Sequence, residues 1–125
     1  MNADIEAKQV ELYEAPDGSF PYETWFDGLK DRATKHRIEG RITRLRKTGN
    51  FGRFTAVGEG VIELQLDFGA GYRIYAGQLG AKVVLLLCGG DKSTQVRDIL
   101  AAKERWAEHL QSRPQKERVV SHATN

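Results

Sequence analysis

The run from Gly60 to Gln95 constrains the fold most, because it carries three strand patterns separated by two tight turns. From Ile62 to Phe68 apolar residues alternate with polar ones, which is the period of a half-buried strand. A glycine-rich turn follows, and the alternation resumes from Tyr72 to Ala76, so the two segments are predicted to form a hairpin. The continuous apolar run from Lys82 to Cys88 indicates a strand covered on both faces. We therefore expect an antiparallel meander in which this last strand is central or nearly so.

Polar residues gather where the meander is expected to end, at the glycine pair 89–90. Asp91, Lys92 and Ser93 follow at once, at the start of a predicted helix whose first backbone N–H groups have no intrahelical acceptor. Arg73 has polar neighbours in the strand pattern and is expected on the open face of the hairpin. The region between that face and the helix start is the candidate site.

The flanking segments supply the remaining predicted elements. A short strand is expected within Gln9 to Glu14, and a helix with an aromatic face begins near Pro21. A second helix, with its arginines opposite an apolar stripe, runs to about Lys47 and stops at Gly49. A glycine-bearing connector, with room for a brief strand at Phe54 to Val57, leads into the meander, and a last helix follows it. The expected class is α+β in the order β-α-α-β-β-β-α.

Length and composition predict one domain, since the 125 residues are 40% hydrophobic and 29% charged. That domain is expected to span 1–113, and the polar, aperiodic segment 114–125 is expected to be a flexible tail. No apolar run is long enough to cross a bilayer and no signal-peptide pattern is present, so a cytoplasmic protein is expected, with no membrane contact. The single cysteine, Cys88, is predicted to be a small core residue. The three histidines show no metal-binding spacing, so no metal or cofactor is expected.

Charge is segregated along the chain although the net formal charge is only +2. Seven acids and one lysine fall between Met1 and Leu29, whereas nine basic residues and two acids fall between Lys30 and Arg53. A positive surface of that kind attracts polyanions and speeds their encounter. A solvated basic helix face with no partner is the alternative explanation of the same pattern.

The stretches GVIELQLDFGAGYRIYAG and LLLCGGDKSTQVRDILAAK resemble toxins of the RelE/ParE superfamily, in the HigB-like branch of addiction-module killer proteins. The aromatic helix YETWFDGL and the basic helix support the resemblance, which covers roughly Val10 to Arg113. It implies a small RelE-like sheet packed against helices, and the toxin component of a type II toxin–antitoxin system. It also implies a metal-independent endoribonuclease that usually cuts messenger RNA at the ribosome, inhibits translation and is silenced by an antitoxin, commonly of the helix-turn-helix type.

The chemistry implied by the resemblance makes demands on particular residues. Attack of an RNA 2′-hydroxyl on its phosphate needs a proton acceptor, cations beside the phosphorane and an acid for the leaving oxygen. Arg73 is expected to anchor the phosphate and Lys92 to be the second cation. Asp91 is expected to act as the base or to position Lys92, and Tyr75 to stack or to donate a proton.

Structural roles compete with each catalytic assignment. Arg73 can instead pair with Glu63 or Asp67 across the hairpin. Asp91 can be a helix cap, and Lys92 an exposed charge.

RNA binding is assigned to the basic segment and to one position of the meander, namely Arg37, Arg41, Arg44, Arg53 and Gln65. Relatives of the resembled family usually carry arginine or lysine at the position of Gln65, and the neutral amide predicts a weak or inactive nuclease. Two other functions therefore stay open. One is a toxin that poisons DNA gyrase by protein binding, and the other is an antitoxin-bound co-repressor.

Overall fold

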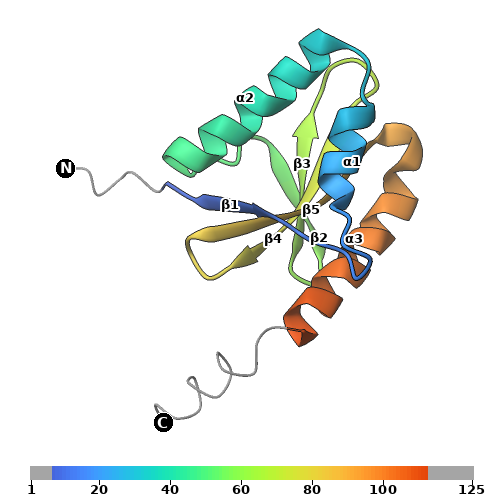
Figure 1. Ribbon diagram of the computed structural model, residues 1–125. Coiled ribbons are helices and arrows are strands. Elements are labelled where there is room, and N and C mark those ends of the chain that lie inside the picture. Colours follow the sequence, from blue (N-terminus) through green and yellow to red (C-terminus); the bar gives the residue numbers. More distant parts are fainter. Residues whose placement is uncertain (1–6, 113–125) are drawn as a thin grey trace, which may run out of the picture.

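Helices cover both faces of one five-stranded sheet in the computed structural model, which describes residues 7–112 (Figure 1). The elements in chain order are β1 (Gln9–Leu12), α1 (Pro21–Gly28), α2 (Arg32–Thr48), β2 (Phe54–Gly58), β3 (Val61–Leu66), β4 (Tyr72–Leu79), β5 (Val83–Asp91), the short 3₁₀ helix η2 (Lys92–Thr94) and α3 (Gln95–Gln111). The predicted α+β class is thus confirmed. The predicted tail at 114–125 lies outside the described residues.

The sheet has the strand order β1-β5-β4-β3-β2, with β1 parallel to β5 and every other pair antiparallel. The meander is confirmed, and β5 lies second from the edge, beside the central β4. The expected element order was short by one strand, because Phe54–Gly58 pairs with β3, with a register shift between Ala56 and Gly58. Positive φ angles at Glu59 (57°) and Gly60 (83°) allow the tight turn that folds β2 back onto β3.

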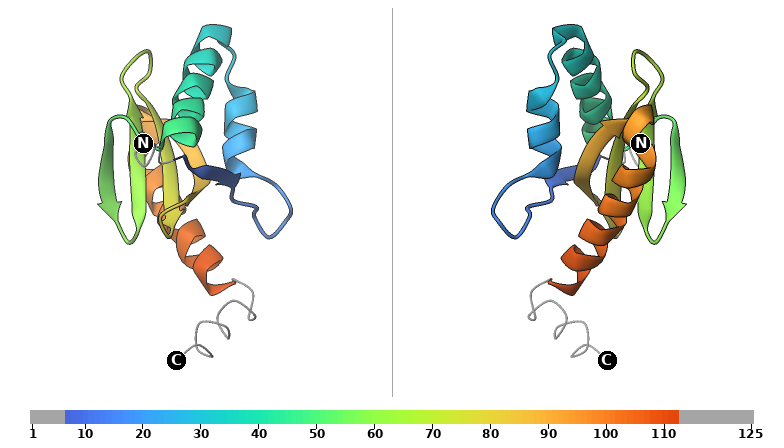
Figure 2. Two further views of the ribbon diagram at one scale, coloured as in Figure 1. Left: turned by 90° about the vertical axis from the view of Figure 1, so that its left-hand side faces the viewer. Right: turned by 90° about the vertical axis from the view of Figure 1, so that its right-hand side faces the viewer.

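Two apolar cores lie on opposite sides of the sheet. α1 and α2 cover one face, where Ile38 and Leu45 pack against Leu64 and Ile74. α3 covers the other face and buries Trp106 against strand residues. Figure 2 shows α1 and α2 together on one side, with α3 apart from them. Because both faces are covered, the side chains of β5 are buried in alternation on the two sides, as its apolar run predicted.

The glycine pair 89–90 lies inside β5, so the prediction that the strand stops there was wrong. Neighbouring helices pack directly on these two residues. A Cβ atom at Gly89 would lie 2.1 Å from the Trp25 ring of α1, and one at Gly90 would lie 1.9 Å from the Asp98 carboxylate of α3. Glycine here permits close approach of both helices to an uninterrupted strand.

The second helix ends where its sequence predicts, and Asp31 caps its start. The Asp31 carboxylate accepts a hydrogen bond from the Thr34 N–H at 3.1 Å, and Gly49 ends the helix with φ of 75°.

Cys88 is buried, and burial raises the pKa of its thiol to about 11, which confirms a core role. No helix within residues 7–112 is long and apolar enough to span a bilayer.

Candidate functional site

A buried carboxylate, Glu63 of β3, lies at the centre of a polar cluster beneath α3. The Tyr75 hydroxyl and Gln95 Nε2 donate to its Oε2 at 2.9 and 2.8 Å, and Gln65 Nε2 donates to Oε1 at 2.9 Å. Burial alone would raise the pKa of Glu63. The three donated hydrogen bonds and the charge of Arg73 outweigh burial and hold that pKa below its ordinary value. The cluster therefore contains a stable anion.

Arg73 belongs to this cluster and is only 7% exposed, so the prediction that it lies on an open face was wrong. The reason is α3, which covers the face that carries Arg73 and Tyr75. Its Nε lies 3.8 Å from Glu63 Oε1 and its Nη1 lies 3.5 Å from Asp67 Oδ1. Pairing with Glu63 and Asp67 was the structural alternative for this arginine, and the structure has both pairs. The buried Arg73 Nε has no hydrogen-bond partner within residues 7–112.

Asp67 connects the buried cluster to the surface. Its carboxylate also pairs with Arg53, whose Nη1 lies 2.5 Å from Oδ2. The Asp67 side chain is 43% exposed and that of Arg53 is 72% exposed, whereas Arg73 is buried. Asp67 thus lies between the guanidinium groups of Arg53 and Arg73. A position between two guanidinium groups also suits a phosphate oxygen.

Asp91 and Lys92 have different surroundings. The Asp91 side chain accepts hydrogen bonds from the Ser93 N–H at 2.8 Å and its hydroxyl at 2.6 Å, so the predicted cap is present. Lys92 is exposed, and its aliphatic stem lies over Gly71. No hydrogen bond or ion pair within the described residues joins either side chain to Arg73. Tyr75 is fully buried against Glu63, which gives its hydroxyl a structural partner. The four predicted catalytic residues therefore do not form one open cluster.

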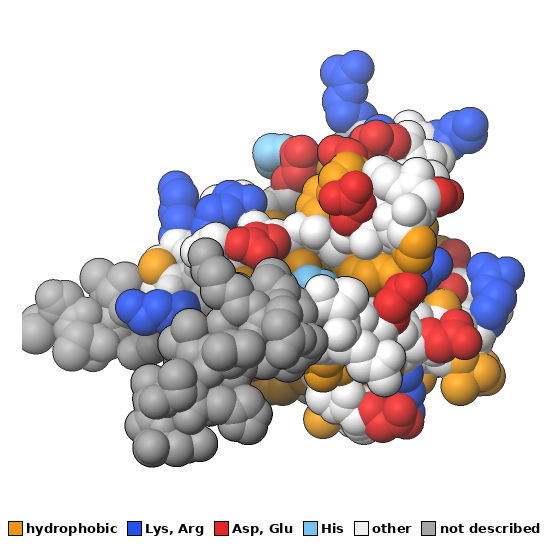
Figure 3. Space-filling view, turned by 60° about the horizontal axis from the view of Figure 1, so that its bottom comes forward, with side chains coloured by type: hydrophobic (Ala, Val, Ile, Leu, Met, Phe, Trp, Pro, Cys, Tyr) orange, Lys and Arg blue, Asp and Glu red, His pale blue; other side chains and the backbone are white. Residues whose placement is uncertain are grey.

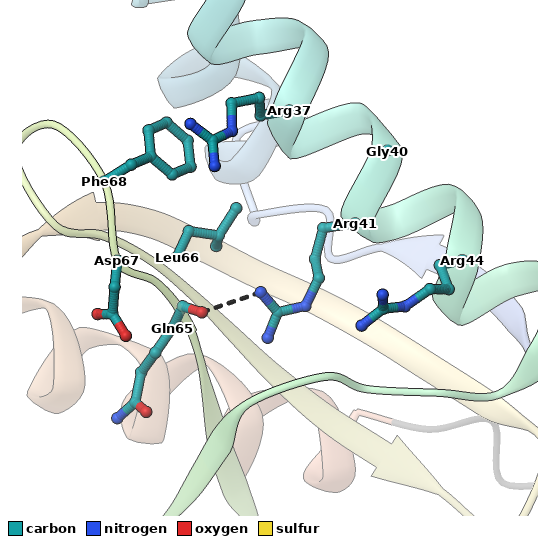
Figure 4. A pocket seen from close by; sticks show the side chains of 8 residues that line it. All are labelled: Arg37, Gly40, Arg41, Arg44, Gln65, Leu66, Asp67 and Phe68. Atoms are coloured by element: carbon teal, nitrogen blue, oxygen red, sulfur yellow. Dashed lines mark hydrogen bonds between the residues drawn. The ribbon is translucent and has the colours of Figure 1, made fainter.

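The predicted RNA-binding residues do come together, around a groove of about 300 Å³ between α2 and the end of β3 (Figure 4). Its lining consists of Arg37, Gly40, Arg41 and Arg44 from α2, with Gln65, Leu66, Asp67 and Phe68 opposite them. The Arg37 guanidinium lies over the Phe68 ring, 3.9 Å from its centroid. Arg53 joins the margin through its ion pair with Asp67. We call this the basic groove.

Arg41 differs from its two neighbours because each of its three guanidinium nitrogens donates a hydrogen bond to a backbone carbonyl. Its Nε donates to the Phe51 carbonyl at 2.8 Å, Nη1 to the Gln65 carbonyl at 2.9 Å and Nη2 to the Arg53 carbonyl at 2.6 Å. Burial, and after it the charge of Arg44, lower the pKa of Arg41. Arg41 therefore has a structural role in addition to the predicted RNA-binding one, because it ties the segment after α2 to β3.

We expect Arg41→Ala to lower the free energy of unfolding by about 2 to 3 kcal/mol, because three carbonyls lose a charged donor. Arg44→Ala is the matched control, since Arg44 is exposed and lines the same groove, and it should change stability by no more than about 0.5 kcal/mol. Urea unfolding of both variants measures the difference. Equal stabilities would mean that the three hydrogen bonds of Arg41 contribute nothing net.

Sequence reasoning missed Gln95 and Phe68 as site residues and named Glu63 only as an alternative partner. Glu63 and Gln95 are 32 positions apart, and only the packing of α3 brings them together. The available signal was the apolar stripe of the last helix, which requires a sheet face to cover. If the apolar stripe of the last helix had been predicted to pack on the polar face of the hairpin, Glu63 would have been predicted to be buried.

One comparison with known proteins gave a relative. An uncharacterized protein of Haemophilus influenzae (strain Rd) is 46% identical over 82 residues, which is 66% of this chain and 82% of the relative. No family model and no solved structure matches the chain.

Proposed function

We propose that this chain, which belongs to the same family as the uncharacterized Haemophilus influenzae protein, is the toxin of a type II toxin–antitoxin system. The proposed target of the toxin is messenger RNA at the ribosome. The observation that carries the proposal is the basic groove. Three arginines of α2 line it with Gln65, and Arg53 stands at its margin. Guanidinium groups bind phosphates through paired hydrogen bonds, and the stacked Arg37 and Phe68 offer a platform for a base.

Cleavage is proposed to follow the metal-independent route of the RelE/ParE superfamily, in which the 2′-oxygen attacks the adjacent phosphorus. The new P–O bond forms as the bond to the 5′-oxygen breaks, leaving a cyclic phosphate and a free 5′-hydroxyl. Arg73 would stabilise the phosphorane once a phosphate displaces Asp67 from it, and Lys92 would approach from the exposed side. Asp91 would position Lys92 or accept the proton. No cofactor is required.

A second function is favoured by a different observation: the cluster around Glu63 is buried beneath α3. Arg73 is ion-paired and buried, Tyr75 is inaccessible, and Gln65 stands where the resembled family usually has a cation. A chain of this kind would bind its targets without cutting RNA. Its partners would then be gyrase, or an antitoxin together with operator DNA.

The antitoxin is proposed to cover the basic groove with an acidic segment. Arg37 and Arg44 are exposed and make no ion pair within residues 7–112, so their charges are available to such a segment. Ribosomal RNA would compete for the same two residues.

Expression of the chain in bacteria, followed by mapping of RNA 5′ ends and of DNA breaks, tests the proposal. We expect new 5′-hydroxyl ends inside translated messages, and their loss when translation initiation is blocked. DNA breaks with intact messages would contradict a nuclease and support gyrase poisoning. Growth inhibition with neither lesion would support action by binding alone.

Asp67→Asn should increase the affinity for single-stranded RNA by about threefold to tenfold at low salt, because one negative charge leaves the basic groove. Glu59→Gln removes the same charge from an exposed residue that pairs with Lys103 instead, and it is the control. Fluorescence anisotropy with a labelled RNA measures both. Equal gains for Glu59→Gln and Asp67→Asn would show that net charge matters and the groove does not.

A further inference from the structure

A second and larger groove, of about 610 Å³, opens between α1 and α2 above β1. Its apolar lining comes from both helices and from two strands, and comprises Val10, Leu12, Tyr22, Phe26, Ile42 and Leu86. Val10, Leu12 and Phe26 are only partly buried, although they pack against the core. The volume is within the usual range for binding pockets. The helices therefore leave apolar surface uncovered at this end of the sheet. We call it the acidic groove, for the charges at its margin.

Three carboxylates line the groove, Glu23 and Asp27 from α1 and Glu39 from α2, against one cation, Arg46. All three are exposed, and none forms an ion pair within residues 7–112. Figure 3 shows acidic side chains (red) next to hydrophobic ones (orange) on one face of the molecule. This surface repels nucleic acid and favours a ligand that is both apolar and cationic.

The backbone of β1 adds a third feature, because β1 is an edge strand. The amides of Gln9 and Tyr13 donate to carbonyls on the β5 side, at Lys82 and Leu86. Since amides alternate in direction along a strand, those of Val10 and Leu12 point away from β5. No other strand within the described residues pairs with that edge. The Lys8 amide points the same way and donates to the Arg46 carbonyl of α2 at 2.9 Å, so α2 meets the start of this edge. A strand edge without a neighbouring strand accepts an added one.

We propose that the acidic groove and the β1 edge bind an extended segment of a partner protein that carries its apolar residues and its lysine or arginine residues together at every second position, on one face of the added strand. The segment adds to the sheet beside β1 and places its apolar side chains over Val10 and Leu12. Its cations meet Glu23, Asp27 and Glu39. The surface differs in sign and lining from the basic groove, so the proposal does not depend on the chain acting on RNA.

The test uses the purified full chain and three synthetic peptides of about six residues, the usual length of a strand. The first carries valine or leucine and lysine or arginine at every second position, with serine between them. The second replaces the cations by glutamate, and the third has proline in place of serine to remove backbone donors. Titrations followed by ¹⁵N–¹H NMR should shift the amides of Val10 and Leu12 with the first peptide only.

Two charge-reversal variants with the same change in net charge locate the binding. Glu23→Lys/Glu39→Lys changes both helices of the acidic groove, whereas Glu14→Lys/Glu104→Lys changes exposed carboxylates outside it. We expect the first to weaken binding of the cationic peptide by about tenfold or more and the second by less than about twofold. Equal losses, unshifted Val10 and Leu12 amides, or undiminished binding of the proline peptide would overturn the proposal.

Discussion

Arg73→Ala should abolish growth inhibition by the chain and lower its free energy of unfolding by about 3 kcal/mol, because it removes one partner of a buried ion pair. Glu63 would keep the three hydrogen bonds from Gln65, Tyr75 and Gln95 but lose its nearest cation. An exposed arginine, as the strand pattern predicted, would have cost almost nothing. Chemical unfolding and growth curves at matched soluble expression measure the two effects.

Loss of fold and loss of chemistry have to be separated, and two further variants do so. Lys92→Ala removes an exposed cation that makes no side-chain hydrogen bond or ion pair within residues 7–112, so stability should change by no more than about 0.5 kcal/mol. Arg73→Lys keeps a positive charge near Glu63 but loses the planar guanidinium fork. It should therefore lose a smaller share of its stability than of its toxicity. A stable Arg73→Lys variant as toxic as the parent would show that the fork is not needed. The assignment of Arg73 to the site would be wrong if Arg73→Ala remained fully toxic.

The strands could be predicted because alternation reports backbone period directly. Ile62 to Phe68 and Tyr72 to Ala76 alternate, and β3 and β4 form there. The same alternation cannot say whether the polar face meets water. Glu63, Gln65 and Tyr75 satisfy one another's hydrogen bonds, so a face that looks solvated in sequence is covered by α3.

Residue spacing predicted only one part of the candidate site, the face of α2 that carries the arginines. Arg37, Arg41 and Arg44 follow one another at helical intervals, so they were correctly placed on one side of α2. Spacing gave no means of distinguishing Arg41, whose role depends on carbonyls at Phe51, Arg53 and Gln65 that only tertiary structure brings within reach. Long-range partners of this kind decide which arginine is structural and which is free to bind a ligand.

Because Arg41 has that structural role, the RNA-binding surface is tested with Arg37→Glu/Arg44→Glu alone. We expect this variant to weaken binding to ribosomes and to single-stranded RNA by about tenfold to a hundredfold at low salt, since both residues are exposed in the basic groove. The slope of log affinity against log salt should fall in magnitude by about 0.7 for each phosphate that the variant no longer neutralises. Stability should fall by no more than about 1 kcal/mol, the cost expected from removing the Arg37 guanidinium from the Phe68 ring.

Arg97→Glu/Arg105→Glu is the matched comparison, because it makes the same change in net charge on α3, outside the basic groove. Long-range attraction depends on net charge and falls equally in both variants, whereas direct pairing with phosphates disappears only where the parent has it. A steeper loss of affinity and of salt slope for Arg37→Glu/Arg44→Glu would therefore locate recognition at α2. The reverse order would place it on α3 and leave the basic face of α2 as a solvated surface.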